Sequence, residues 1–312
     1  MITNNAHSWY LIVNPAAGHG AAKKQLDDFL EALLANDFKF EIVETSHRNH
    51  ALDLVREGIE KGFRKIIAMG GDGTNNEVVN GIMLQTEVIT SEISYCLFPV
   101  GTGNDWIKEH KIPTDLRPWI EMLKVEKTSL QDIGLVKYYK NGEQQQRYFA
   151  NVAGMAYDAF VCAEMEKRKR PLRNRLAYLF FGLYYVFKYS LQKARVHFNG
   201  KTVEDYFYLI NAGICRYSGG GMQFVPHAIP DDGKLALTLA GRLNKIGVLL
   251  NSYRFYNGKI AGHAKVNIFQ TDHVKIEAVD RPILVEVDGE LLGETPVEFS
   301  IIPKALKVVV PY

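Results

Sequence analysis

Apolar residues recur with two alternating periods along the first 130 residues. Short apolar runs at 9–13, 65–69 and 94–100 predict buried strands, and the alternation at 38–42 predicts a half-buried strand. Residues 21–36, 51–61 and 75–84 carry apolar side chains at helical spacing, which predicts three helices. Strands separated by helices in this way predict a parallel sheet that is covered on both faces.

The pattern changes after about residue 131, where strand signals crowd together. The dipeptides Asn141-Gly142 and Asn199-Gly200 are typical of hairpin turns. We expect a β-sandwich with helical insertions at 158–192 and 243–257. The predicted domains are therefore residues 1–132 and 133–295. The expected strands are 134–139, 147–152, 194–198, 205–211, 235–239, 266–270, 274–278, 283–287 and 297–301.

Composition and charge narrow the class of protein. A length of 312 residues fits two domains. The chain has 37 Lys and Arg against 35 Asp and Glu, and this balance argues against a nucleic-acid-binding protein. Cys96, Cys162 and Cys215 are widely spaced, which favours a reducing compartment over a disulfide framework. No targeting segment is visible, and the longest apolar run, 176–187, is shorter than the roughly 20 residues of a membrane span. We expect a cytoplasmic protein, and the sequence leaves its oligomeric state open, a homodimer included.

Three glycine-rich loops each follow a predicted strand of the first domain. Glycine lets the backbone approach a ligand closely, and N–H groups at the start of the next helix favour an anion. Open parallel sheets bind ligands at the carboxyl ends of their strands, where these loops lie. A nucleotide phosphate is the natural ligand, although any single glycine loop can be a plain turn. The loops begin at Asn14, Gly70 and Gly101.

The motifs in these loops resemble those of the diacylglycerol kinase catalytic-domain superfamily, which also contains sphingosine and ceramide kinases. Residues 70–81, Gly-Gly-Asp-Gly-Thr-Asn-Asn-Glu-Val-Val-Asn-Gly, resemble its GGDGTxNEVxNG signature. Residues 14–18 resemble NPxxG, and 99–105 resemble PxGTxND. Residues 219–233 resemble GGGM…PxA…DG, and 287–290 contain the late DGE. The order and coverage of the motifs are similar to those of the soluble bacterial lipid kinases in the family.

The resemblance implies both a fold and an ATP site. Family members have an α/β nucleotide domain similar to NAD kinase and phosphofructokinase, and a C-terminal β-sandwich whose last strand returns to the first domain, here at about 296–312. ATP would lie in the cleft between the domains. One implied ATP contact, Thr45, follows the second predicted strand, and on the sequence alone it would be the cap of the next helix. By position, the implied ATP contacts are Asn14, Pro15, Ala16, Ala17, Gly18, Thr45, Gly70, Gly71, Asp72, Gly73, Thr74, Asn75, Asn76 and Thr102.

The resemblance also implies two roles for Mg²⁺. A carboxylate beside phosphates is sensible when Mg²⁺ bridges them, which makes Asp72 a candidate catalytic residue. A structural Mg²⁺ is implied at Asp232 with the backbone carbonyls of Ile229 and Lys234. The alternative there is a plain Asp-Gly turn. The family pattern DGxLD lacks its final acid here, since Ala236 stands in that place.

Glu290, in the DGE motif, is the implied general base. Phosphoryl transfer to an alcohol needs an acceptor for the hydroxyl proton. On bare sequence, Glu290 would be a solvated hairpin residue, and only the resemblance favours catalysis. Asp288 would support the base, and Asp132 is either part of the metal network or a domain-junction residue. Asp158 lies in a further family motif to which we assign no role.

Residues 167–195 contain nine basic and no acidic side chains around the apolar run at 176–187. This composition is typical of a helix that binds a membrane surface, and equally of a core helix with a solvated basic end. A peripheral position at the inner membrane face is therefore one of two interpretations.

Together these features predict an ATP- and Mg²⁺-dependent kinase that phosphorylates a lipid hydroxyl, either on diacylglycerol or on a sphingoid or ceramide-like lipid. One alternative is an NAD kinase, which shares the GGDGT loop. Another is a non-catalytic module that binds nucleotide or membrane. The intact Asp72 and Glu290 argue against the second alternative.

Overall fold

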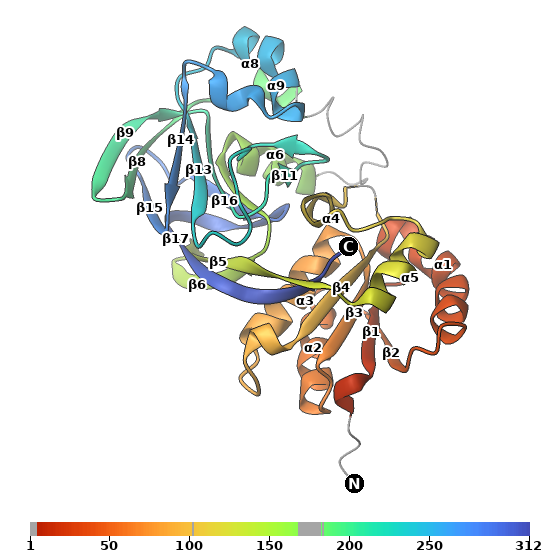
Figure 1. Ribbon diagram of the computed structural model, residues 1–312. Coiled ribbons are helices and arrows are strands. Elements are labelled where there is room, and N and C mark those ends of the chain that lie inside the picture. Colours follow the sequence, from red (N-terminus) through yellow and green to blue (C-terminus); the bar gives the residue numbers. More distant parts are fainter. Residues whose placement is uncertain (1–4, 102, 168–181, 183) are drawn as a thin grey trace. The chain divides into compact units, whose positions relative to one another are not determined.

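The computed structural model describes residues 5–101, 103–167, 182 and 184–312 (Figure 1). The chain divides into two compact units. Unit 1 contains residues 1–132 and 304–312, and unit 2 contains residues 133–303. The return segment of unit 1 thus begins at residue 304, later than the expected 296.

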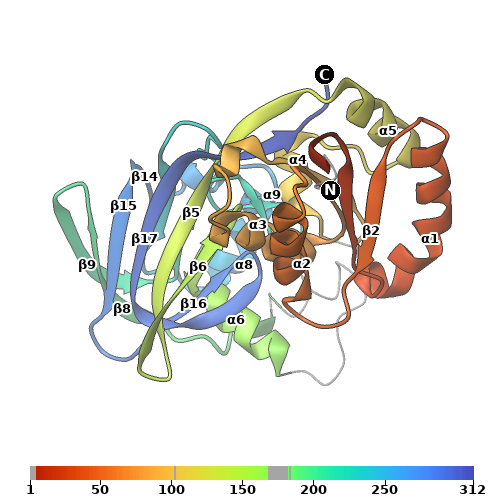
Figure 2. The same cartoon turned by 90° about the horizontal axis from the view of Figure 1, so that it is seen from below.

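Unit 1 is a parallel sheet with the strand order β2-β1-β3-β4. Figures 1 and 2 show α1 and α5 on one side of these strands and α2 and α3 on the other. The central strands are fully buried because helices cover both faces, as their continuous apolar runs predict. The elements are β1 (Trp9–Val13), α1 (Ala17–Leu34), β2 (Phe40–Glu44), α2 (His50–Glu60), β3 (Lys65–Gly70), α3 (Asp72–Leu84), β4 (Ser94–Pro99), α4 (Asp105–His110) and α5 (Leu116–Val125).

Two long strands continue from one unit into the other along the chain. They are β5 (Thr128–Lys140) and β17 (Glu290–Val309). Near its end, β17 pairs in parallel with β4, through Lys307 opposite Ser94. The start of β17 pairs with strands of unit 2 and continues without a break, which is why the return segment begins later than expected.

Unit 2 is built from antiparallel strands in the order β14-β13-β10-β7-β16-β17, and β15, β8 and β9 continue from β17. The helices α8 and α9 lie together in the upper part of Figure 1. The other elements are β6 (Glu143–Phe149), β7 (Val152–Ala156), α6 (Tyr157–Glu166), β8 (Gln192–Phe198), β9 (Lys201–Phe207), β10 (Leu209–Gly213), β11 (Tyr217–Ser218), β12 (Met222–Gln223), β13 (Leu235–Ala240), α8 (Lys245–Asn251), α9 (Tyr253–Tyr256), β14 (Val266–Thr271), β15 (His273–Ala278) and β16 (Leu284–Val287).

Several strand predictions were wrong in detail: β5 and β17 are much longer than the strands expected at 134–139 and 297–301. The strand expected at 147–152 is broken because the backbone N–H groups of Ala150 and Asn151 donate to the Asp288 carboxylate. The strand expected at 205–211 is two strands, since the chain changes partner at Tyr208 from β8 to β7 and β13. The strand expected at 38–42 begins at Phe40 and lies at the sheet edge, where Ile42 is exposed.

Candidate active site

The first glycine loop connects β1 to α1 and is tied to its neighbours by Asn14. The Asn14 backbone N–H donates to the Met69 carbonyl at 3.0 Å, and its side-chain oxygen accepts from the Ala16 N–H at 3.1 Å. Its amide nitrogen donates to the Thr74 hydroxyl at 2.9 Å, which joins the first loop to the second. Gly18 has a φ of +60°, and an added Cβ would come within 3.0 Å of Val100. The expected residues 14–18 therefore lie together at the carboxyl end of β1.

The second loop passes from β3 into α3 with almost no intervening residues. A Cβ on Gly70 would lie 2.4 Å from the Thr74 hydroxyl oxygen, so only glycine fits there. Asp72 is the first helical residue, and its carboxylate accepts from the Asp105 backbone N–H at 2.9 Å. This bond joins the second loop to the third. The first turn of α3 thus opens within the glycine motif, where its N–H groups favour an anion.

Two expected ATP contacts in α3 have side chains that point into unit 1. Asn75 is buried, and its side-chain oxygen accepts from the Tyr95 hydroxyl at 2.8 Å. Asn76 is also buried, and its carbonyl accepts from the Asn80 amide at 2.9 Å. These amides hold the helix in place, which leaves the backbone of the first turn as the part able to meet a phosphate.

The third loop follows β4. The Asn104 side chain donates to the Gly101 carbonyl at 3.1 Å, and Lys108 donates to the Gly103 carbonyl at 3.0 Å. Lys108 also forms an ion pair with the buried Asp105. Thr102, an expected ATP contact, lies outside the described residues.

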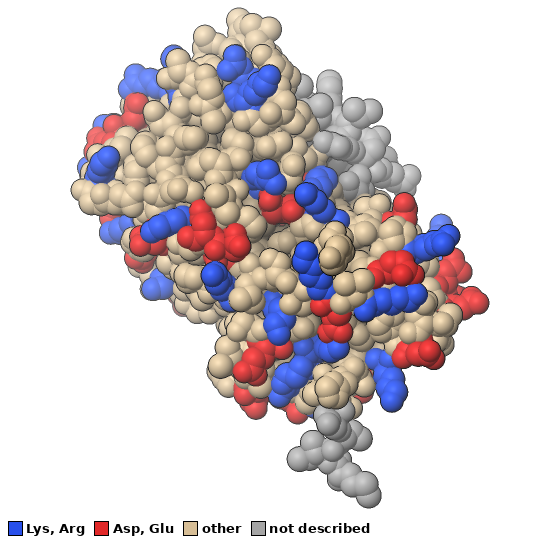
Figure 3. Space-filling model, in the orientation of Figure 1, with Lys and Arg blue, Asp and Glu red and all other residues tan. Residues whose placement is uncertain are grey.

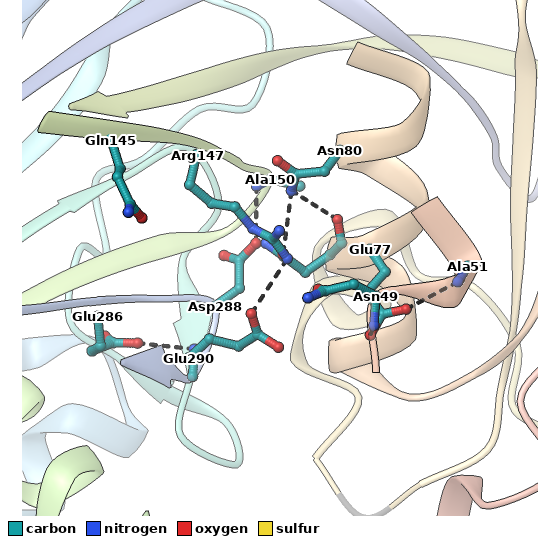
Figure 4. Close-up of polar contacts among 12 residues, drawn as sticks. Asn49, Ala51, Glu77, Asn80, Gln145, Arg147, Ala150, Glu286, Asp288 and Glu290 are labelled. Carbon is teal, nitrogen blue, oxygen red and sulfur yellow. Dashed lines mark hydrogen bonds and ion pairs between the residues drawn. The ribbon is translucent and has the colours of Figure 1, made fainter. Parts of the chain in front are cut away.

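Thr45 lies directly after β2, and its N–H donates to the Val13 carbonyl at 2.8 Å. The alternative role as a helix cap does not hold, because α2 begins at His50. That helix start is instead capped by Glu77, whose carboxylate accepts from the N–H groups of Asn49 at 2.8 Å and Ala51 at 3.2 Å (Figure 4). The sequence alone suggested no role for Glu77, although it is the Glu of the GGDGTxNEVxNG signature at residues 70–81.

Asp132 is fully buried, and its carboxylate accepts from the Lys304 backbone N–H at 2.7 Å. This contact holds the return segment of unit 1. Of the two interpretations of Asp132, the structure favours the junction residue.

In unit 2, Asp288 and Gly289 form the turn between β16 and β17, with φ values of +50° and +85°. The Asp288 carboxylate accepts three backbone N–H groups, from Ala150 and Asn151 at 3.1 Å and from Val152 at 3.2 Å (Figure 4). Asp288 therefore fixes the turn against the start of β7. The expected support of Glu290 by Asp288 stays a prediction.

Glu290 is the first residue of β17 and follows this turn directly. Its carboxylate lies 3.3 Å from the Arg147 guanidinium on β6 (Figure 4). The two side chains are only 17% and 14% exposed, so the ion pair is largely shielded from water. The Glu290 carboxylate is thus fixed by an ion pair with Arg147, in contrast to the solvated hairpin residue that the sequence alone suggested.

A second pair of carboxyl groups, Asp158 and Glu286, lies behind the same turn. Glu286 is 3% exposed and accepts from the Gly289 N–H at 2.9 Å (Figure 4). Asp158 accepts from the Asn211 amide at 2.9 Å. Gly154 leaves room for both, because a Cβ there would lie 2.3 Å from one carboxyl and 2.4 Å from the other.

Burial controls the protonation of this pair. Desolvation, followed by the negative charge of Asp158, holds the pKa of Glu286 well above its usual range. Desolvation also raises the pKa of Asp158 to about 6, while hydrogen bonds from Asn211 and Glu286 oppose that rise. Both carboxyl groups are therefore protonated more readily than exposed carboxyl groups are. Sequence reasoning missed Glu286 because its partners lie on distant segments.

The expected structural metal site is an exposed turn before β13. The Asp232 carboxylate accepts from the Lys234 N–H at 2.9 Å and from the Gln270 amide at 3.0 Å, and Gly233 has a φ of +72°. One carboxylate and two carbonyls, those of Ile229 and Lys234, form an oxygen donor set of the kind that Mg²⁺ accepts. Within the described ranges, no three or more His, Cys, Asp or Glu side chains group in a way that would hold a metal ion.

An apolar pocket lies within unit 2. Asp158 is one of the residues that line it. Such a pocket suits an apolar ligand with a polar end. It is lined by Tyr157, Asp158, Val161, Gly182, Val186, Tyr208, Leu209, Met222, Phe224, Leu243, Gly247, Val248, Asn251, Ser252, Phe255, Tyr256, Ile260 and His263.

Comparison with family models gives two matches that together cover most of the chain. The diacylglycerol kinase catalytic domain matches residues 8–137, and the YegS C-terminal NAD kinase beta sandwich-like domain matches residues 151–310. The chain belongs to the diacylglycerol and YegS-like lipid kinase family. Members of this family are phosphotransferases that act on an alcohol group.

Curated relatives agree along nearly the whole length. A diacylglycerol kinase from Bacillus subtilis strain 168 is 24% identical, with coverage of 96% of this chain and 95% of the relative. One from Staphylococcus haemolyticus is 25% identical, covering 96% and 87%. A probable YegS-like lipid kinase from Stenotrophomonas maltophilia is 26% identical, covering 97% and 96%.

Solved structures share the fold. A putative diacylglycerol kinase from Bacillus anthracis matches with a TM-score of 0.77 at 21% identity over 98% of both chains. Yeast NADH kinase complexed with NADH matches with a TM-score of 0.51 at 12% identity, over 99% of this chain and 85% of that one. The predicted fold class, an NAD kinase-like α/β domain followed by a β-sandwich-like domain, is confirmed.

Proposed function

We propose that this family member transfers the γ-phosphoryl group of ATP to the hydroxyl of a lipid, either diacylglycerol or a sphingoid or ceramide-like lipid. The observation that carries the proposal is the joining of the three loops of unit 1. The bonds from Asn14 to Thr74 and from Asp105 to Asp72 gather a helix start, glycines and one ligand-type carboxylate at the carboxyl ends of three strands. This edge can bind phosphates through backbone N–H groups.

In this proposal, Asp72 would hold Mg²⁺ together with the ATP phosphates, and the bound ion would neutralise charge on the transferred group. Glu290 accepts the proton of the lipid hydroxyl as the hydroxyl oxygen bonds to the γ-phosphorus. The bond to the β–γ bridging oxygen breaks, and ADP leaves. Arg147 and the Asp288 turn orient the Glu290 carboxylate.

The pocket in unit 2 supports a lipid as the acceptor. The surface of its lining is almost wholly apolar, and Asp158 is among the lining residues. An acyl or sphingoid chain would contact the apolar lining, while its polar end would lie toward the carboxyl groups. A nicotinamide dinucleotide is polar along its length and suits such a lining poorly.

Two further assignments belong to this proposal. Asp232, with the carbonyls of Ile229 and Lys234, would hold a structural Mg²⁺ at the turn before β13. We also propose that the enzyme works in the cytoplasm, at the inner face of the membrane. The wide spacing of Cys96, Cys162 and Cys215 in the sequence favours a reducing compartment, and a lipid acceptor would be met at the membrane surface. Among the residues that the structure describes, no helix combines the length and hydropathy needed to cross a bilayer.

The test is transfer of labelled phosphate from ATP and Mg²⁺ to a panel of diacylglycerol, ceramide, sphingosine and NAD. We expect label in a lipid, and a loss of about 10²- to 10⁴-fold in Glu290→Gln, because general base catalysis contributes that much. Glu143→Gln, an exposed change in the same unit, should retain full activity.

Three results would contradict the proposal in different ways. Label in NAD alone would identify an NAD kinase. Full lipid kinase activity in Glu290→Gln would remove the base. Nucleotide binding without transfer to any acceptor would identify a non-catalytic module.

A further inference from the structure

The face of α8 and α9 that points away from the apolar pocket is itself apolar. Ile246, Leu250 and Tyr253 follow helical spacing and are 68%, 70% and 57% exposed. The opposite side of the same turns, through Gly247 and Val248, lines the pocket. A helix that is apolar on opposite faces is normally buried on both. Here one apolar face lines the pocket and the other is exposed, and an exposed apolar patch of this kind marks an interaction surface.

A second segment extends this surface. Tyr184 and Phe187 are 45% and 56% exposed, and Lys245 at the start of α8 donates a hydrogen bond to the Phe187 carbonyl. This contact places the two segments side by side. We call the five side chains Tyr184, Phe187, Ile246, Leu250 and Tyr253 the α8 face.

Basic residues predominate in the chain segment that carries the α8 face, and one of them, Arg242, pairs with Asp205. Residues 241–265 contain five Lys and Arg and no Asp or Glu. Lys188 lies 4.9 Å from the Tyr184 ring centroid, and Lys245 is exposed beside Ile246. Lys and Arg side chains lie among the uncharged residues over α8 and α9 in Figure 3. Aromatic and aliphatic side chains with a basic surround match an anionic bilayer surface, where the apolar groups enter the headgroup region and the cations meet lipid phosphates.

We propose that the α8 face docks unit 2 on an anionic lipid bilayer. The inference rests on the proposed function, since that function requires a lipid acceptor to pass from a bilayer into the pocket. Docking through this face would bring the bilayer close to the pocket, because α8 lies between the proposed bilayer-facing surface and the pocket. A chain drawn out of the bilayer would need to pass only one layer of side chains.

The test is co-sedimentation with vesicles of phosphatidylcholine, with and without phosphatidylglycerol, in the absence of ATP. We expect wild-type protein to bind the anionic vesicles, and added salt to weaken binding by screening. The double variant Ile246→Ser with Leu250→Ser should bind about tenfold more weakly or worse, because two inserted side chains are lost. Ile89→Ser, which changes a 67% exposed side chain of unit 1, should bind as wild type does.

A kinase assay separates this inference from the proposed function. The double variant should lose activity on acceptor held in anionic vesicles and retain it on a short-chain acceptor dissolved as monomers. Unchanged vesicle binding in the double variant, or no binding by wild type, would overturn docking whatever the kinase assay gives. The oligomeric state of both proteins should also be measured. A dimeric wild type and a monomeric double variant, with equal vesicle binding, would show that a second copy covers the α8 face.

Discussion

The glycine loops of unit 1 and the Glu290 turn of unit 2 are built from opposite kinds of group. The loops present backbone N–H groups and small side chains, held together by two side-chain hydrogen bonds. The turn gathers four carboxyl groups, Asp158, Glu286, Asp288 and Glu290, from separate elements. The first arrangement suits an anion, and the second suits the acceptance and storage of protons.

The four carboxyl groups differ in their surroundings, and these surroundings, rather than the residue type, determine the role that we assign to each. Asp288 is fixed by three N–H groups, and Glu290 faces a cation. Glu286 is buried, and desolvation together with the charge of Asp158 holds its pKa well above the usual range. Only Glu290 combines an ionised partner with a position directly after the turn, which is why we assign the base to it.

The largest effect should come from Asp72, the carboxylate among the N–H groups of the loops. Asp72→Asn keeps an oxygen for the Asp105 N–H, so unit 1 should fold normally. It removes the negative charge that would hold Mg²⁺, and we expect phosphoryl transfer to fall by about 100-fold or more. Initial rates over a Mg²⁺ titration measure this loss, with the exposed change Asp27→Asn on α1 as control. A variant with wild-type Mg²⁺ dependence would show that the loops work without a carboxylate.

The next effect concerns Glu286, which we interpret as a positioning residue for Glu290. Glutamine mimics the protonated acid, because it can accept from the Gly289 N–H and donate to Asp158. We therefore expect Glu286→Gln to keep kcat within about threefold of wild type. Glu286→Ala leaves the Gly289 N–H without its partner, and kcat should fall about tenfold as the turn loosens.

Measurement of kcat and KM for ATP distinguishes a positioning role of Glu286 from a general loss of folded structure. Since the nucleotide loops belong to unit 1, KM for ATP should stay constant in both Glu286 variants while kcat changes only in Glu286→Ala. Equal losses in both variants would mean that the carboxyl group at 286 acts through its charge.

These contrasts also explain what the sequence could and could not predict. Asn14, Thr74 and Asp72 stand in short contiguous motifs after strands, so their grouping follows from the parallel sheet alone. The pair of Asp158 and Glu286 is made by α6 and β16, which are distant in sequence, and no local pattern marks it. The break in the strand expected at 147–152 has the same origin, because the cause is the carboxylate of Asp288, 137 residues from Asn151. Long-range polar contacts of this kind leave no periodic signal.

The smallest effect is a pH dependence of stability that belongs to unit 2 alone. Folding raises the pKa of Asp158 to about 6 and that of Glu286 further above its usual range. Between the unfolded pKa of about 4 and these values, the native state binds more protons than the unfolded chain. The free energy of unfolding therefore falls as pH rises through this window. The slope is at most about 1.4 kcal/mol per pH unit for each retained proton.

Asp158→Asn isolates this contribution, because asparagine does not titrate. Urea unfolding monitored in unit 2 between pH 4.5 and 7 should show a flatter fall in the variant than in wild type. Glu143→Gln, an exposed change on β6, should keep the wild-type slope. The same slope in wild type and Asp158→Asn would mean that the carboxyl pair ionises alike in the folded and unfolded chains. In that case burial would not separate Glu286 from Glu290, and the choice of Glu290 as base would rest on position alone.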